Sequence, residues 1–161
     1  MSEPIDYIER TRSQYDALGY PPYRWVENIQ QPPFVPLKKP LATSRVGLVC
    51  SGGIYQAGQV AFHFKDDFSY RIIPADAPKS SLRVTHFAYD LRDDREDVNV
   101  VYPAEQLRAL AAAGVIEEFS TNTYTFMGGI YSARRVREQL APALVEAFVR
   151  DEVDVVVLVP V

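Results

Sequence analysis

The protein has 161 residues, of which 47% are hydrophobic and 24% charged, and this is the size and composition of one globular domain. Its net charge of −4 argues against nucleic acid as a partner, because phosphate binding needs a concentrated basic surface. The single cysteine, Cys50, excludes an internal disulfide, and the sequence contains no cysteine–histidine set with the spacing of a metal site.

Neither end of the sequence predicts targeting or membrane insertion. The first residues are charged where a signal peptide would carry its apolar region. The longest strongly apolar run, residues 155–161, is far shorter than the ~20 residues that a membrane helix needs. We therefore expect a cytoplasmic protein with no membrane partner.

The first predicted element is a helix over residues 4–18. Its apolar side chains recur at near-helical spacing, with a proline suited to the first turn: Ile5, Ile8, Tyr15, Leu18 and Pro4. Gly19 follows directly, and glycine at this position ends many helices because it adopts the left-handed conformation at little cost.

Residues 20–40 are rich in proline, which neither a regular helix nor a central strand accommodates. We expect an extended arm with exposed aromatic side chains, packed on its own domain or against a partner. The predicted organisation is an amino-terminal helix and arm over residues 1–40, followed by an α/β domain over residues 41–161.

The second part alternates strands and helices. Apolar runs typical of strands occupy residues 45–50, 82–86 and 153–161, and helical patterns occupy residues 102–114 and 132–150, the latter with Ser132 as N-cap. The last run is almost entirely β-branched and apolar on both faces, as in a central parallel strand that helices cover on both sides. These elements predict an open, mostly parallel sheet with flanking helices, of the Rossmann-like or flavodoxin-like class.

Polar residues that follow a strand are the first candidates for a site, because ligands bind beyond the carboxyl ends of the strands in such sheets. His86 ends the second run, and Tyr89 and Asp90 follow it by three and four residues. A histidine with a nearby carboxylate can act as a general acid or base, which makes His86 and Asp90 catalytic candidates and Tyr89 a substrate-binding candidate. The alternative is a histidine that holds its loop together through backbone hydrogen bonds, with Asp90 capping a turn.

Two glycine pairs are further substrate-binding candidates. Gly52 and Gly53 follow the first strand, and Gly128 and Gly129 precede the last helix. Backbone amides in glycine turns and at helix N-termini favour anions such as a substrate carboxylate. Plain turns are the alternative at both places.

Three other features carry weaker signals. Arg71 is a candidate because it can pair with a substrate carboxylate, or simply with Asp67. The acidic residues Asp93, Asp94, Glu96 and Asp97 are interleaved with Arg92 and Arg95 and lack the EF-hand pattern, so we expect a solvated loop and no metal. Cys50 is expected to be a buried thiol before a tight turn rather than a reactive group.

Six segments in the same order resemble the selenoprotein B family of glycine, sarcosine, betaine and D-proline reductases, and are most similar to its D-proline branch. They are the first strand with its glycine pair, DDFSYRIIP, THFAYD, DVNVVYPAEQLRALAAAGVI, TFMGGIYS and DVVVLVPV. The resemblance covers residues 45–161. It implies an oxidoreductase that cleaves a C–N bond of an amino acid or small amine held on the pyruvoyl group of a partner reductase subunit.

The resemblance also implies a selenocysteine in a UxxC motif directly after a strand like residues 155–161. This sequence has no such motif, so the redox residue is expected after Val161 and the chain alone is expected to be incomplete or inactive. A chain cut short at a UGA codon and a naturally short relative with another role both fit. The alternative function is a non-catalytic binding or assembly module, and an exposed final strand would favour a homo-oligomer such as a dimer.

Overall fold

A computed structural model describes residues 4–161, which form two compact units divided between Phe34 and Val35. In the first unit, helix α1 spans Tyr7–Ala17, and the Asp6 side chain caps it by accepting the Glu9 N–H at 3.0 Å. Gly19 follows the helix with a φ of +71°, as predicted. Pro4 precedes the helix instead of lying in its first turn, so that detail of the prediction was wrong.

The rest of the first unit is an extended segment, and aromatic rings within the unit hold it to α1. Tyr23 lies between Tyr15 and Trp25, with ring centroids 5.8 Å and 4.7 Å away in edge-on geometry. Tyr7 contacts Trp25 in the same way at 6.1 Å. No side chain of α1 is buried, so the apolar residues that predicted the helix do not form a core of their own.

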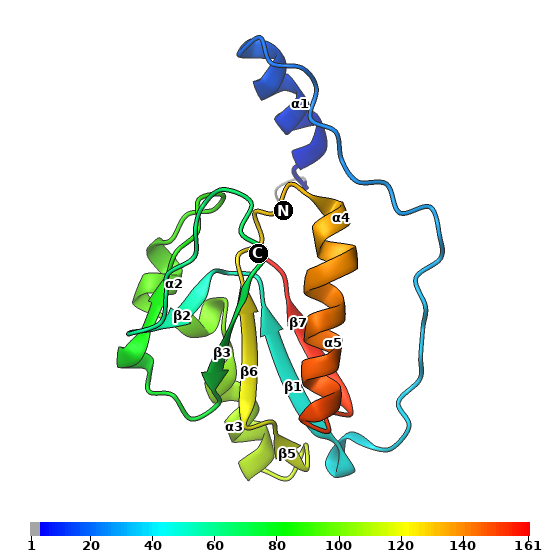
Figure 1. The fold of residues 1–161 in the computed structure, drawn as a ribbon, viewed down its shortest axis with the longest axis vertical. Coiled ribbons are helices and arrows are strands. Elements are labelled where there is room, and N and C mark those ends of the chain that lie inside the picture. The colour runs from blue at the N-terminus through cyan, green and yellow to red at the C-terminus, as the bar shows by residue number, and fades with distance from the viewer. Residues whose placement is uncertain (1–3) are drawn as a thin grey trace. The chain divides into compact units, whose positions relative to one another are not determined.

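The second unit contains a curled, mostly parallel sheet with helices on both faces, as predicted (Figure 1). Strand β1 (Arg45–Cys50) is central, and β5 (Glu118–Phe119) and β6 (Asn122–Phe126) pair with one edge of it while β7 (Val155–Val159) pairs with the other. All three run parallel to β1, whereas β3 (Tyr70–Pro74) runs antiparallel to β6.

A small second sheet joins β2 (Ile54–Gln56) to β4 (Leu82–Val84) in antiparallel register. The second predicted strand thus exists but is shorter and lies outside the main sheet. The remaining short elements are 3₁₀ turns and one short helix: Leu41–Thr43, Lys79–Ser81, Val98–Val100 and α2 (Arg92–Glu96). Among the described residues, no helix is both long and apolar enough to span a bilayer.

Alternate residues of β1 pack against different helices. Leu48 and Cys50 belong to the buried group that contains Leu107 of α3 (Ala104–Ala112). Val49 belongs to the group that contains Phe148 of α5 (Ala141–Arg150). This alternation is the expected consequence of the two-residue period of a strand, and it buries β1 on both faces.

The predicted final helix is present but contains one irregular turn. Ser132 caps it, as expected, by accepting the Arg135 N–H at 3.3 Å. Helix α4 (Ala133–Arg135) continues into a π-helical turn (Val136–Leu140), which leads into α5. Such a turn holds one residue more than an α-helical turn and is uncommon in proteins.

Strand β7 confirms the prediction of a parallel strand, but its position in the sheet differs from the prediction. Its residues pair with β1 from Val46↔Val155 to Cys50↔Val159, and both buried groups reach its two faces. Within the described residues, β1 is its only neighbouring strand, so β7 forms an edge and Leu158 is 71% exposed. Its apolar pattern reflects the helices on both faces and does not report how many strands flank it.

Candidate functional site at the carboxyl ends of the parallel strands

Ser51, the residue after β1, ties three chain segments together at the carboxyl edge of the sheet. Its N–H donates to the Val159 carbonyl of β7 at 3.0 Å, and its carbonyl accepts the Gly128 N–H at 2.8 Å. Its hydroxyl oxygen accepts the Val161 N–H at 2.9 Å. The end of β7 and both glycine-containing turns therefore meet at one place.

The first glycine pair packs against the segment that carries His86. Gly53 has a φ of +70°, and a Cβ there would lie 1.9 Å from the Thr85 carbonyl oxygen. The Thr85 N–H donates to the Gly53 carbonyl at 2.9 Å, and the Tyr89 hydroxyl lies 3.0 Å from the Gly52 carbonyl. Glycine is needed at position 53 for both its backbone conformation and this close approach.

The second glycine pair also contacts the segment that carries His86. A Cβ at Gly129 would lie 2.4 Å from Cζ of Phe87, and the Phe87 ring stacks at 6.4 Å on Tyr131. The structure therefore brings both glycine pairs, His86 and Tyr89 together, although their order along the chain did not require this. Close packing explains why glycine occupies these positions.

His86 lies at the centre of this group and is 9% exposed. Its Nδ1 accepts the Ala88 N–H at 3.0 Å, and its ring lies 4.7 Å from the Tyr89 ring, centroid to centroid. Burial lowers the pKa of His86, and the negative charge of Asp94 opposes that effect. Its Nε2 is buried without a hydrogen-bond partner among the described residues.

Asp94, the acid beside His86 and Tyr89, was not predicted. It is 2% exposed on α2, and its Oδ2 lies 2.8 Å from the Tyr89 hydroxyl. Burial and this contact raise the pKa of Tyr89. The expectation of a solvated loop over residues 93–97 was therefore wrong for Asp94, because the turn of α2 directs this one acid inward.

Asp90 and Arg71 lie outside the group around His86. Asp90 is exposed and pairs with Arg92 at 2.5 Å. The Arg71 side chain donates to the Val60 carbonyl at 2.7 Å and lies over the Phe62 ring at 4.2 Å, so it holds its own loop in place. Its nearest carboxylate is that of Asp67 at 3.9 Å, which matches the simpler of the two interpretations.

Cys50 is fully buried on β1, in the apolar group under α3. Burial raises the pKa of its thiol, so the reactive thiolate is disfavoured. No group of three or more potential metal ligands occurs among residues 4–161. The described part of the candidate site thus offers an imidazole, a phenol and a carboxylate, but no accessible thiol.

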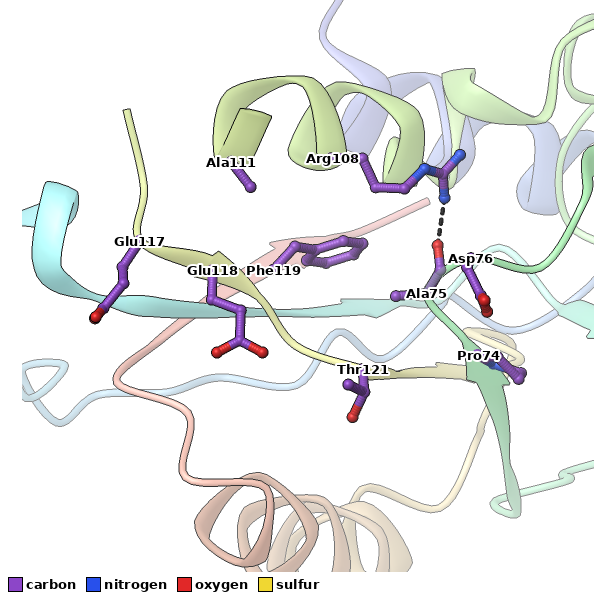
Figure 2. A pocket seen from close by; sticks show the side chains of 9 residues that line it. All are labelled: Pro74, Ala75, Asp76, Arg108, Ala111, Glu117, Glu118, Phe119 and Thr121. Atoms are coloured by element: carbon purple, nitrogen blue, oxygen red, sulfur yellow. Dashed lines mark hydrogen bonds between the residues drawn. The ribbon is translucent and has the colours of Figure 1, made fainter. Parts of the chain in front are cut away.

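A separate cavity of about 580 Å³ lies at the opposite end of the sheet, near the amino end of β6, and β5 itself forms part of its lining. Figure 2 shows Arg108 reaching from α3 to donate a hydrogen bond to the Ala75 carbonyl, with Phe119 beneath the helix. Its lining is Pro74, Ala75, Asp76, Arg108, Ala111, Glu117, Glu118, Phe119 and Thr121. It contains no histidine, cysteine or glycine turn, so the chemistry favours the carboxyl edge.

Comparison with known proteins agrees with the resemblance of the six segments. The family model for glycine/sarcosine/betaine reductase selenoprotein B matches residues 23–161. The D-proline reductase subunit gamma of Acetoanaerobium sticklandii is 32% identical over 127 residues, which are 79% of this chain and 52% of that protein. The chain thus spans about half the length of this curated relative, and no solved structure matched. The chain belongs to the glycine/sarcosine/betaine reductase selenoprotein B family.

Proposed function

We propose that the chain is the substrate-side part of a reductase subunit that takes part in reductive C–N bond cleavage of an amino acid or small amine. Family membership supports a reductase-subunit role. The observation that carries the proposal is the meeting of His86, both glycine pairs and the end of β7 at the carboxyl edge of the sheet, where α/β proteins bind ligands.

In this proposal, His86 is the proton-transfer group, and Tyr89 and the glycine turns line the place where the substrate binds. Burial lowers the pKa of His86, so its ring is neutral near neutral pH, and because Nδ1 accepts the Ala88 N–H the ring carries its proton on Nε2. That Nε2–H has no partner among the described residues and would be available to donate toward the substrate.

The nucleophile of such a reaction needs a source other than Cys50, because that thiol is buried and its pKa is raised. We propose a selenocysteine outside residues 1–161, whose selenolate would supply the nucleophile at neutral pH. A residue following Val161 in a longer chain would emerge beside Ser51, to which the Val161 N–H already donates. A pyruvoyl group on a partner subunit would supply the carbonyl that holds the substrate amine.

Reading the gene beyond the Val161 codon tests the first half of this proposal. A UGA codon, an in-frame cysteine codon three positions later and a further helical stretch would support it. A UAA or UAG codon with no continuation would overturn it and favour the binding or assembly module.

Activity tests the second half. The complete gene product, with selenium incorporated, should be co-expressed with its partner subunit and assayed for thiol-dependent cleavage of D-proline, glycine, sarcosine and betaine. We expect His86→Asn to abolish cleavage and His63→Asn, which changes the exposed second histidine, to leave it intact. A complete protein that cleaves none of these compounds would refute the proposal.

A binding or assembly module is the second candidate, and the first unit favours it. Ile29 and Phe34 of the extended segment are 93% and 92% exposed, and large exposed apolar side chains are typical of interaction surfaces. Light scattering of the chain, compared with an Ile29→Ser, Phe34→Ser variant, tests whether this segment mediates self-association. A homo-oligomer that becomes monomeric in the double variant would support this candidate, and a monomer in both would contradict self-association through the segment.

A further inference from the structure

Two buried polar atoms in the candidate site lack a hydrogen-bond partner among the described residues, and they are of opposite character. One is Nε2 of His86 and the other is Oδ1 of Asp94. Their residues are 9% and 2% exposed, so bulk water does not reach them freely. Buried polar groups without partners are costly, so each such group in a native protein calls for an explanation.

The hydrogen bond at Nδ1, the second ring nitrogen of His86, determines where the proton of the ring lies. Nδ1 accepts the Ala88 backbone N–H at 3.0 Å, so it carries no proton itself. The neutral ring must therefore carry its proton on Nε2, which makes Nε2 a hydrogen-bond donor.

The contacts of Tyr89 fix the position of Asp94. The Tyr89 hydroxyl lies 2.8 Å from Asp94 Oδ2 and 3.0 Å from the Gly52 carbonyl, while its ring packs on His86. Tyr89 thus joins the carboxylate, the imidazole and the glycine turn. Oδ1, the other oxygen, remains an acceptor without a donor.

We propose that Asp94, held by the Tyr89 hydroxyl, is the acidic partner of His86 in the buried group that Tyr89 joins. The unpaired donor on His86 and the unpaired acceptor on Asp94 are complementary, and attraction through space in a buried region needs no direct bond. Asp94 is in this sense a positioning residue for His86. The inference concerns the site of the proposed function and deepens it.

The titratable groups around the His86 ring are few, which makes the pairing measurable. Tyr89 faces it from its own segment, and Asp94, on α2, is the group whose charge acts on it. The adjoining turn after β1 contributes Ser51, Gly52 and Gly53, none of which titrates near neutral pH. A change of charge at position 94 should therefore register directly in the titration of His86.

Ring NMR of the ¹⁵N-labelled chain tests the pairing. The chain has two histidines, so a His63→Asn background leaves the ring signals of His86 alone. In this background we expect two-bond ¹H–¹⁵N spectra at high pH to show the proton on Nε2. Adding Asp94→Asn should lower the pKa of His86 further, whereas Asp93→Asn, an exposed acid on the same helix, should leave it unchanged.

Two results would overturn the inference. The first is a proton on Nδ1 with Asp94 intact, a measurement that stands even if Asp94→Asn does not fold. The second is an equal pKa of His86 in folded Asp93→Asn and Asp94→Asn chains. Neither measurement needs a substrate, so the pairing is tested separately from the proposed function. The pairing can hold in a protein that cleaves no amine, and a protein that cleaves an amine can lack the pairing.

Discussion

Replacing Gly53 by alanine tests whether the turn after β1 requires glycine for its contact with Thr85. Gly53 and Gly114 provide a matched pair, with φ values of +70° and +72°. A Cβ at Gly114 meets nothing within 4 Å, whereas a Cβ at Gly53 lies 1.9 Å from the Thr85 carbonyl oxygen. The two substitutions therefore share the backbone strain and differ only in the clash.

The expected losses in the free energy of unfolding follow from these distances. Gly114→Ala should cost only the left-handed strain, about 1–2 kcal/mol. Gly53→Ala adds the retreat of a backbone carbonyl from 1.9 Å to an ordinary contact, which breaks the 2.9 Å bond from Thr85 to the Gly53 carbonyl. With that bond worth about 1 kcal/mol and the local sheet disturbed, we expect a total of about 3–4 kcal/mol.

Urea unfolding followed by circular dichroism measures both losses, provided that the two variants keep the same dependence on urea concentration. A loss in Gly53→Ala that exceeds the loss in Gly114→Ala by about 2 kcal/mol would confirm the reasoning. Equal losses of unfolding free energy in the two variants would refute it, because they would show that a Cβ at position 53 does not clash with the Thr85 carbonyl.

Three further predictions concern buried groups. Cys50 should resist iodoacetamide at pH 8 in the folded chain, because burial raises the pKa of its thiol, and it should react once urea unfolds the chain. Mass spectra that show equally fast labelling of the folded and the unfolded chain would contradict this prediction. Lowering the pH below about 6.5 should destabilise the wild type more than His86→Asn, because burial lowers the pKa of His86 and the unfolded chain binds the proton first. Urea titrations at pH 7 and pH 5 measure this, and parallel losses would show that His86 is not the group responsible. Tyr124→Phe should cost about 1–2 kcal/mol in thermal or urea unfolding, because it removes the 2.5 Å bond from its hydroxyl to the poorly exposed Asp151; an unchanged stability would show that the bond contributes little.

Much of the fold could be predicted because apolar periodicity reports which faces are buried. The valine-rich run predicted β7 and its two covered faces, and Ser132 predicted the start of the last helix. The same signal does not count neighbouring strands, so it could not show that β7 forms an edge within the described chain. Nor could it show that Val136–Leu140 forms a π-helical turn, since one extra residue barely alters the pattern.

The candidate site was predicted in part, for a similar reason. Strand ends and glycine pairs pointed to the right edge of the sheet, because backbone rules govern where turns occur. The acid beside His86 depends on tertiary packing, and nothing in the sequence separates the buried Asp94 from the exposed Asp93. Asp90 was the nearer carboxylate along the chain, yet it is exposed and pairs with Arg92.

The π-helical turn lets the two ends of one helix face different neighbours. Beyond it, Leu144 and Phe148 pack on the sheet, while before it Arg135 pairs with Asp66 at 3.2 Å and lies over the Phe68 ring at 5.0 Å. Deleting one residue from the turn would make the helix regular and rotate its first part by about 100°. Arg135 would then point away from the loop that it anchors. The extra residue of the π-helical turn therefore sets the rotation of the first part of the helix, which contacts the loop, relative to the part that packs on the sheet.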